Sequence, residues 1–417
     1  MSDARRWNLP VPPDPLPWSA PRTGRSAAGP WLRLCGLTAT AAAVATVASG
    51  SLGIAHRALA VIAIPPLAAL VVAAWTAHRE LLPWTVAALG SFLVAIGTWW
   101  AGAAHVAAAG IALAVIAVAT AQLHRGDIGP VGAWRDYVTL TKPRIMSLLL
   151  LTGACGMFVG AEGVPPLGDF AAMLVGLALA CGGASALNHV LDRDIDKLMG
   201  KRTRSRPVAT GRIAPERALE FGLALSAFSF VLLGSLTNVL TAVLALVGNL
   251  FYVLVYTRWL KRSTPQNIVI GGAAGAVPPL VGWAAATGNL TLPALALFAI
   301  VFFWTPPHFW ALALLIKRDY ENARIPMLPV VRGERETVKQ IVLYTLVLIA
   351  VTLVPFAIGM SGVPYLASAL VLGGIFLWLA WRLRAELVPR RAAVLFHYSL
   401  AYLALLFVAL ALDPLVA

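Results

Sequence analysis

The chain has 417 residues, of which 59% are hydrophobic and only 12% are charged. This composition excludes a soluble globular domain and is typical of a protein that crosses a membrane many times. The formal net charge of +14 is explained by the Lys and Arg that cytoplasmic loops of membrane proteins carry, so we expect no nucleic-acid partner. The sequence therefore predicts an all-α polytopic membrane protein.

The N-terminal 30 residues are rich in Pro, Ser and Arg and contain no apolar segment, so we expect a disordered cytoplasmic tail. Thirteen apolar runs follow, each near the length that crosses about 30 Å of hydrocarbon. They lie approximately at 32–53, 57–77, 82–101, 103–122, 145–163, 169–189, 217–236, 238–257, 267–286, 291–315, 340–359, 365–382 and 396–412. With the N-terminus in the cytoplasm, nearly all Lys and Arg fall in cytoplasmic loops, which predicts the orientation.

A polar connector at 124–144 divides these spans into a four-helix membrane domain at 31–123 and a nine-helix domain at 145–417. In the first domain, His56 and His105 lie on alternate predicted helices near the outer surface. Paired histidines at matching depth can ligate heme iron from both sides in a four-helix bundle, so these two residues are heme-binding candidates. The alternative is that both are ordinary interfacial histidines, because histidine is inexpensive at that depth.

The polar segment at 188–207 begins where the sixth predicted span ends. Asn188, Asp192 and Asp196 are spaced i, i+4, i+8 and share one face of a helix. Two carboxylates at this spacing repel each other unless a cation lies between them, which predicts a metal site. The arginines that follow, among them Arg202 and Arg206, are suited to phosphate oxygens. The alternative is a solvated loop with helix-end charges.

Two further cytoplasmic loops carry ionisable groups. In the loop at 256–267, Lys261 and Arg262 can neutralise phosphate. In the loop at 317–329, Asp319 is the expected second metal ligand. Lys317 and Arg318 add positive charge there, and together with Arg202, Arg206, Lys261 and Arg262 they form the predicted diphosphate-binding set.

His308 lies inside a predicted span beside two prolines. An ionisable residue within a membrane is a functional candidate, although a satisfied core histidine is the alternative.

Several segments of the chain resemble one known family. They are Asn188-x3-Asp192-x3-Asp196, Lys201-Arg-Thr-x-x-Arg206-Pro, Tyr256-Thr-x-Trp-Leu-Lys-Arg-x-Thr-Pro-Gln-Asn267, His308-Phe-Trp, Asp319-Tyr and Ile325-Pro-Met-Leu-Pro329. Together they look like the heme branch of the intramembrane UbiA-type prenyltransferases, the protoheme IX farnesyltransferases or heme O synthases. The N-terminal four-helix domain weakly resembles half of heme A synthase.

The resemblance implies nine helices around a central cavity, and transfer of farnesyl from farnesyl diphosphate to a vinyl group of heme b to give heme O. It implies Mg²⁺ held by Asn188, Asp192 and Asp196, with Asp319 at a second site, and Asn188, Asp192, Asp196, Lys261 and Asp319 as the catalytic set. In the wider superfamily a second carboxylate precedes Asp319 by four residues, but here that position is Leu315.

Two other functions fit parts of the pattern. One is a UbiA-type transferase acting on a quinone precursor or lipid, and the other is a heme or lipid transporter. We expect location in the inner (plasma) membrane with the active site facing the cytoplasm. The expected partners are the bilayer, farnesyl diphosphate and heme b, with heme A synthase or oxidase assembly proteins as further candidates, and the N-terminal bundle is a candidate site for a bound heme.

Overall fold

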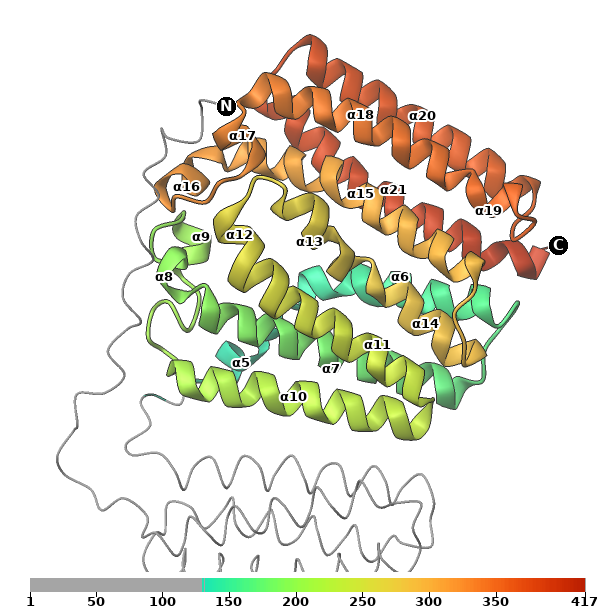
Figure 1. Cartoon of the computed structure of the whole chain (residues 1–417), viewed down its shortest axis with the longest axis horizontal. Helices are drawn as coiled ribbons and strands as arrows, with labels where there is room; N and C mark the ends of the chain where they lie inside the picture. Colours follow the sequence, from blue (N-terminus) through green and yellow to red (C-terminus); the bar gives the residue numbers. More distant parts are fainter. Residues whose placement is uncertain (1–129, 131, 417) are drawn as a thin grey trace, which may run out of the picture.

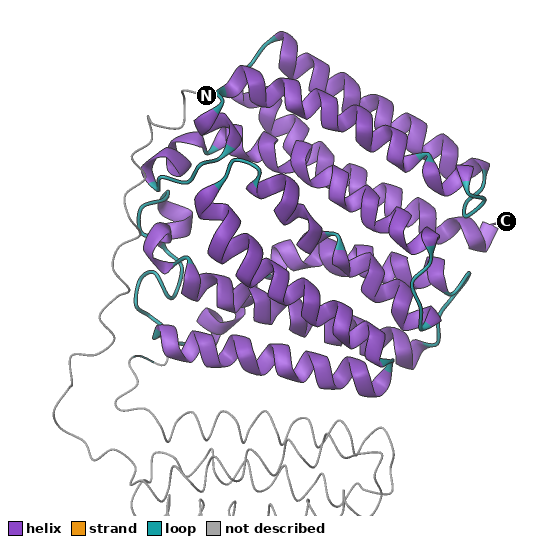
Figure 2. Ribbon diagram, in the orientation of Figure 1, coloured by secondary structure: helices purple, strands orange, loops and turns teal. Residues whose placement is uncertain are grey.

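The computed structural model of the protein describes residues 130 and 132–416, which form an all-helical bundle (Figure 2). Within this part of the chain, nine helices are long and apolar enough to cross a membrane. They match one to one the nine spans predicted between residues 145 and 412, which confirms that part of the prediction. The predicted tail at 1–30, the four-helix domain at 31–123 and the connector up to residue 129 lie outside the described residues and stay predictions.

Nine units of membrane-spanning length follow one another along the described part of the chain. Their helices are labelled in Figure 1. The first five are α6 (Pro143–Gly160), α7 (Leu167–Leu191), α10 (Pro215–Leu236), the joined α11 (Val239–Leu250), η3 (Phe251–Leu260) and α12 (Lys261–Ser263), and the joined α13 (Asn267–Gly275) and α14 (Val277–Thr287). The last four are α15 (Leu292–Leu315), α18 (Glu334–Thr352) with α19 (Val354–Ala357), α20 (Val363–Ala385) and α21 (Pro389–Val416).

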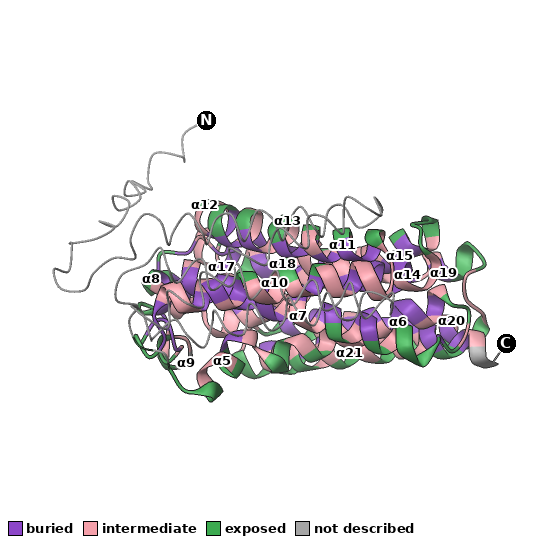
Figure 3. Ribbon diagram, turned by 90° about the horizontal axis from the view of Figure 1, so that it is seen from below, coloured by how far each residue is buried: buried purple, intermediate pink, exposed green. Residues whose placement is uncertain are grey.

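Short helices gather at one end of this bundle (Figures 1 and 3). They are α5 (Trp134–Thr141), α8 (Arg193–Asp196), α9 (Lys201–Arg204), α16 (Lys317–Asn322) and α17 (Leu328–Val331). This is the end at which all three polar loops of the predicted site emerge. The fold therefore brings segments far apart in sequence to one mouth of the bundle.

Prolines and polar first turns set the helix boundaries. Pro143 occupies the first turn of α6, where its missing N–H is not needed. Two helices begin earlier than the apolar runs indicate, α18 at Glu334 and α21 at Pro389. Their first turns carry charged side chains, which form helix outside the hydrocarbon and are missed when only apolar residues are counted.

The fifth span is interrupted where the sequence places two prolines. α13 ends at Gly275 and α14 begins at Val277, with Pro278 in its first turn. A proline ring removes one backbone donor and clashes with the preceding turn, so the helix restarts there.

Next to this break, α14 packs very closely on α6. A Cβ atom on Gly282 would overlap the carbonyl oxygen of Gly153, so only glycine permits this approach.

The largest apolar core joins α15, α18, α20 and α21. Buried residues are coloured purple on the ribbon in Figure 3. α15 packs against α13, α14, α18 and α21, so it has neighbours on most of its circumference. Polar side chains on α15 consequently face the interior of the bundle and the adjoining helices.

Candidate functional site

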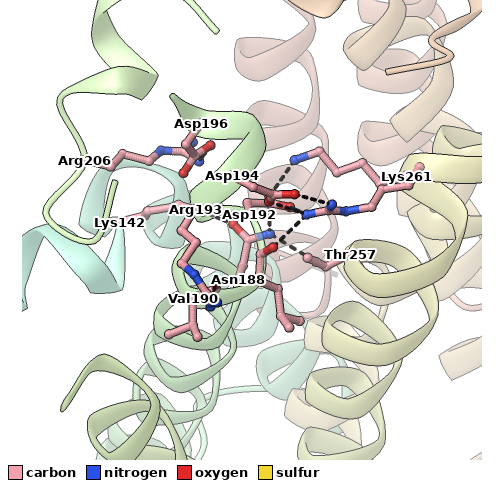
Figure 4. A network of polar contacts seen from close by, with 12 residues as sticks. Lys142, Asn188, Val190, Asp192, Arg193, Asp194, Asp196, Arg206, Thr257 and Lys261 are labelled. Atoms are coloured by element: carbon pink, nitrogen blue, oxygen red, sulfur yellow. Dashed lines mark hydrogen bonds and ion pairs between the residues drawn. The ribbon is translucent and has the colours of Figure 1, made fainter. Parts of the chain in front are cut away.

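The first polar motif lies at the cytoplasmic-side end predicted for α7. α7 ends at Leu191, Asp192 lies at the junction, and α8 ends with Asp196. Hydrogen bonds from Asp192 N–H to the Asn188 carbonyl (2.9 Å) and from Asp196 N–H to the Asp192 carbonyl (2.8 Å) keep the i, i+4 spacing across the junction. All three side chains are buried, and they lie together as the spacing predicts (Figure 4).

Asn188 connects three elements. Its Oδ1 accepts a hydrogen bond from Lys142 Nζ at 2.7 Å, and its Nδ2 donates to Asp192 Oδ2 at 2.8 Å and to Thr257 Oγ1 at 3.1 Å. Burial, together with repulsion from nearby cations, lowers the pKa of Lys142 to about 7, although the two aspartates oppose this shift. The amide therefore links the start of α6, the end of α7 and η3.

Asp192 forms a buried ion pair with Lys261, whose Nζ lies 2.5 Å from Asp192 Oδ2. Lys261 directly follows η3, a π-helix that runs from Phe251 to Leu260. π-helical turns are rare and occur often at functional sites. Here the segment brings Thr257 and Lys261 to the same pair of residues, Asn188 and Asp192.

Asp196 pairs with Arg206, whose guanidinium donates to Asp196 Oδ1 at 2.7 Å. Burial nevertheless raises the pKa of Asp196, since the loss of water outweighs the favourable charge of Arg206. A divalent cation beside this carboxylate would reverse the direction of that shift. The predicted phosphate ligands Lys261 and Arg206 thus contact the aspartates in this structure.

Each buried aspartate keeps one oxygen without a hydrogen-bond partner, Asp192 Oδ1 and Asp196 Oδ2. Asp192 Oδ1 has only a longer ion-pair contact, 3.9 Å from Arg262 Nη2. Buried carboxylate oxygens are normally hydrogen-bonded, so two that are not, in the same cluster, are free to accept a further ligand. Mg²⁺ is commonly held by one or two carboxylates, with waters and substrate phosphates completing its shell. Asp192, Asp196 and the neighbouring Asn188 therefore fit such an ion.

The predicted second metal ligand, Asp319, lies on α16. Its carboxylate packs against Gly200, four residues beyond Asp196, so closely that a Cβ at this glycine would overlap it. Leu315, where the second carboxylate of the wider superfamily would stand, is partly buried against the core. Among the residues the structure describes, no group of three His, Cys, Asp or Glu side chains is placed to hold a metal. Asp319 as a ligand therefore stays a prediction.

The remaining predicted phosphate ligands make other contacts. Arg262 donates to both oxygens of the half-exposed Asp194 at 2.7 Å and to the carbonyl of Leu191. This pairing lowers the pKa of Asp194 even though burial acts in the opposite direction. Lys317 pairs with Glu334 at 3.1 Å.

The last two members of the set are placed less fully. Arg318 is exposed on α16, and Arg202 lies in α9. Their contact with a diphosphate, like that of Arg262 and Lys317, stays a prediction.

His308 lies on α15 against α21. Its Nδ1 is 2.6 Å from Ser399 Oγ, and its ring stacks between Trp304 and Phe396. His308 is therefore an ordered interior residue, and heme binding by it stays a prediction. The other two heme candidates, His56 and His105, lie outside the described residues.

Sequence reasoning missed two residues of this cluster. Lys142 lies in the predicted connector, and its contact with Asn188 depends on how α6 packs against α7. His189 is buried with neither ring nitrogen hydrogen-bonded. No sequence signal distinguishes that burial from an exposed helix end.

The family model of the UbiA prenyltransferase family matches residues 149–416. A protein named protoheme IX farnesyltransferase from Symbiobacterium thermophilum is 54% identical over 281 residues, covering 67% of this chain and 94% of that protein. A protein of the same name from Roseiflexus sp. is 52% identical over 282 residues, covering 68% of this chain and 53% of that protein. The chain thus matches about half the length of some curated relatives and nearly all of others.

Solved structures share this architecture. One is described as digeranylgeranylglyceryl phosphate synthase, with a TM-score of 0.57 at 16% identity over 68% of this chain and 99% of that one. Another, a UbiA homologue from Archaeoglobus fulgidus bound to Cd²⁺, has a TM-score of 0.50 at 16% identity over 66% of this chain and 99% of that one. At this identity the similarity concerns the fold and carries no statement about the ligand.

Proposed function

The chain belongs to the UbiA prenyltransferase family, and from that premise we propose that it transfers farnesyl from farnesyl diphosphate to a vinyl group of heme b, giving heme O. The observation that carries the proposal is the pair of buried aspartates, each with one oxygen that accepts no hydrogen bond, beside lysine and arginine at the end of a membrane bundle. This arrangement suits a metal-bound diphosphate. The choice of heme b as acceptor is supported by the names of relatives that are 52–54% identical.

Diphosphate departure is the step that the cationic side chains assist. Asn188, Asp192 and Asp196 would hold Mg²⁺, which supplies a Lewis acid to stabilise the charge that develops on the leaving diphosphate. Lys261 and Arg206 are within reach of the same oxygens because they already contact these carboxylates. Arg202, Arg262, Lys317 and Arg318 complete the proposed phosphate set, with Asp319 as the proposed second ligand.

The farnesyl cation must be kept from water until C1 has bonded to the vinyl carbon. The bond between C1 of farnesyl and the diphosphate oxygen breaks, and its electron pair leaves with the diphosphate. C1 then bonds to the terminal vinyl carbon of heme b, and water adds to the adjacent carbon and loses a proton. The apolar interior of the bundle shields the farnesyl cation and accommodates its hydrocarbon tail.

The cellular setting follows from the same proposal. The protein is a multi-pass membrane protein whose bacterial relatives indicate the plasma membrane. We place the site on the cytoplasmic side, where the Lys and Arg of the loops gather. Heme A synthase and oxidase assembly proteins are proposed partners, and a heme bound by the N-terminal domain belongs to the same proposal.

A direct assay tests this function. Membranes containing the protein are incubated with farnesyl diphosphate, Mg²⁺ and heme b, and heme O is measured by chromatography. A parallel reaction offers a phenolic quinone precursor in place of heme b. We expect heme O only in the first reaction, and product only in the second reaction would overturn the choice of acceptor.

A further inference from the structure

The hydroxyl of Ser399 lies between two groups. Ser399 Oγ is 2.6 Å from the carbonyl oxygen of Phe396, which can only accept, and 2.6 Å from His308 Nδ1. When Ser399 donates to that carbonyl, its oxygen accepts from His308 Nδ1, which then carries the proton. In that tautomer the lone pair of the neutral ring is on Nε2, which has no hydrogen-bond partner among the described residues.

The surroundings hold the ring in one orientation. Trp304 stacks on one face with ring centroids 4.2 Å apart at 15°, and Phe396 stacks on the other at 4.9 Å and 23°. Trp304 Nε1 also donates to the Ser399 carbonyl at 2.7 Å, which ties α15 to α21 beside the imidazole. Ser399 itself is fully buried, so water does not compete for these hydrogen bonds.

This arrangement matches the needs of a metal-binding histidine. Such a residue almost always donates its other ring N–H to a fixed acceptor, which sets the tautomer and raises the basicity of the ligating nitrogen. Heme iron is commonly held by a neutral imidazole. His308 also lies seven residues before the end of α15, about 10 Å from the mouth at 1.5 Å per residue. His308 therefore lies within the span and not at its end.

We infer that His308 binds the iron of the heme acceptor through Nε2, and that Ser399 is a positioning residue that holds the imidazole in the required tautomer. The inference rests on the proposed function, because it takes heme b as the acceptor. To the proposed function the inference adds a protein ligand for the heme iron, His308, and a residue on α21, Ser399, that acts through His308. The iron contact would fix the position of the porphyrin relative to the diphosphate site.

The test is a heme-binding measurement that involves no prenyl transfer. The full chain in lipid nanodiscs is titrated with heme b without farnesyl diphosphate or Mg²⁺, and the absorption bands of histidine-ligated heme are followed. His308→Ala should lose these bands and bind heme at least about tenfold more weakly, and added imidazole should restore the bands. Ser399→Ala should weaken binding by about tenfold, whereas Ser399→Thr, which keeps the hydroxyl, should bind nearly as the parent does.

Two controls separate this site from other histidines. His397 lies on α21, the helix that carries Ser399, and its side chain is exposed. Its Nδ1 contacts the carbonyl oxygen of Ala393, so His397→Ala should leave the heme spectrum unchanged. The series is repeated with His56→Ala and His105→Ala, so that ligation by the N-terminal candidates does not mask the effect. A spectrum and affinity unchanged in His308→Ala would overturn the iron contact, and an unchanged Ser399→Ala would overturn the positioning role.

The outcome is independent of the test of function. A protein that makes heme O but binds heme without His308 keeps the proposed function and loses this inference. A protein that binds heme through His308 but makes no heme O loses the proposed function and keeps the site.

Discussion

Two buried carboxylates at opposite ends of the bundle differ in how their oxygens are used. Asp413 on α21 accepts hydrogen bonds from Gly362 N–H at 2.5 Å and from Tyr365 N–H at 3.3 Å, one on each oxygen. It therefore caps the start of α20 and both oxygens are satisfied. Asp192 is equally well buried, but only its Oδ2 accepts hydrogen bonds and its Oδ1 has no hydrogen-bond partner.

The comparison distinguishes a structural carboxylate from one that awaits a ligand. A buried polar atom without a partner lowers stability, so a protein that keeps one gains something else at that position. At Asp413 the gain is a helix end with its amides satisfied. At Asp192 and Asp196 the oxygens without a hydrogen bond, beside Lys261, Arg206 and Arg262, indicate a site for a metal-bound anion.

The largest expected effect separates these two aspartates. Asp192→Asn should lower heme O formation by at least about 10²-fold, because it removes negative charge from the metal site. Asp413→Asn, the matched control, should keep activity within about threefold, because asparagine retains an oxygen that can accept a hydrogen bond at the start of α20. Chromatographic product rates and thermal unfolding of both variants measure this. Equal activity in the two variants would contradict the assignment of Asp192 as a metal ligand and of Asp413 as a structural carboxylate.

The buried ion pair gives the next largest effect. Lys261→Met leaves the Asp192 carboxylate buried without its lysine, which costs about 3–5 kcal/mol when one member of a buried pair is lost. Added Mg²⁺ and farnesyl diphosphate should recover part of the lost stability, because the cation replaces the ammonium. Unfolding temperatures with and without these ligands report it. A loss of stability that Mg²⁺ does not reduce would argue against a metal beside Asp192.

The close packing of α14 on α6 at Gly282 gives a structural contact to compare with the metal site. Gly282→Ala places a methyl group on the Gly153 carbonyl and should destabilise the protein by about 1–3 kcal/mol through overpacking of α6 on α14. Gly374→Ala is the control, because a Cβ on this α20 glycine meets nothing within 4 Å. Thermal unfolding compares the two variants. If Mg²⁺ and farnesyl diphosphate raised the unfolding temperature of Gly282→Ala as much as that of Lys261→Met, the stabilisation would not be specific to the metal site.

The smallest effect is expected at the rim. Asp194 is half-exposed and paired with Arg262, and exposed ion pairs contribute about 0–1 kcal/mol. Asp194→Ala should therefore change the unfolding temperature little and activity by no more than about threefold. Steady-state rates at two salt concentrations check it. A loss as large as that of Asp192→Asn would move the metal site toward Asp194.

The sequence predicted the nine spans of the described residues well, because hydrocarbon thickness constrains helix length. It also placed Asn188, Asp192 and Asp196 together, since their spacing fixes their relative positions. It did not predict that Lys261 and Arg206 contact the aspartates, because those pairings depend on how η3 and the 197–206 loop fold back over α7. The interior location of His189 depends on packing in the same way.

The central claim is that Asp192 and Asp196 hold a divalent cation for an allylic diphosphate. Calorimetric titration of the full chain with farnesyl diphosphate, with and without Mg²⁺, tests it most directly. We expect Mg²⁺ to tighten binding at least about tenfold in the parent and in Asp413→Asn, and to have no such effect in Asp192→Asn or Asp196→Asn. The same Mg²⁺-dependent tightening in all four proteins would contradict the claim.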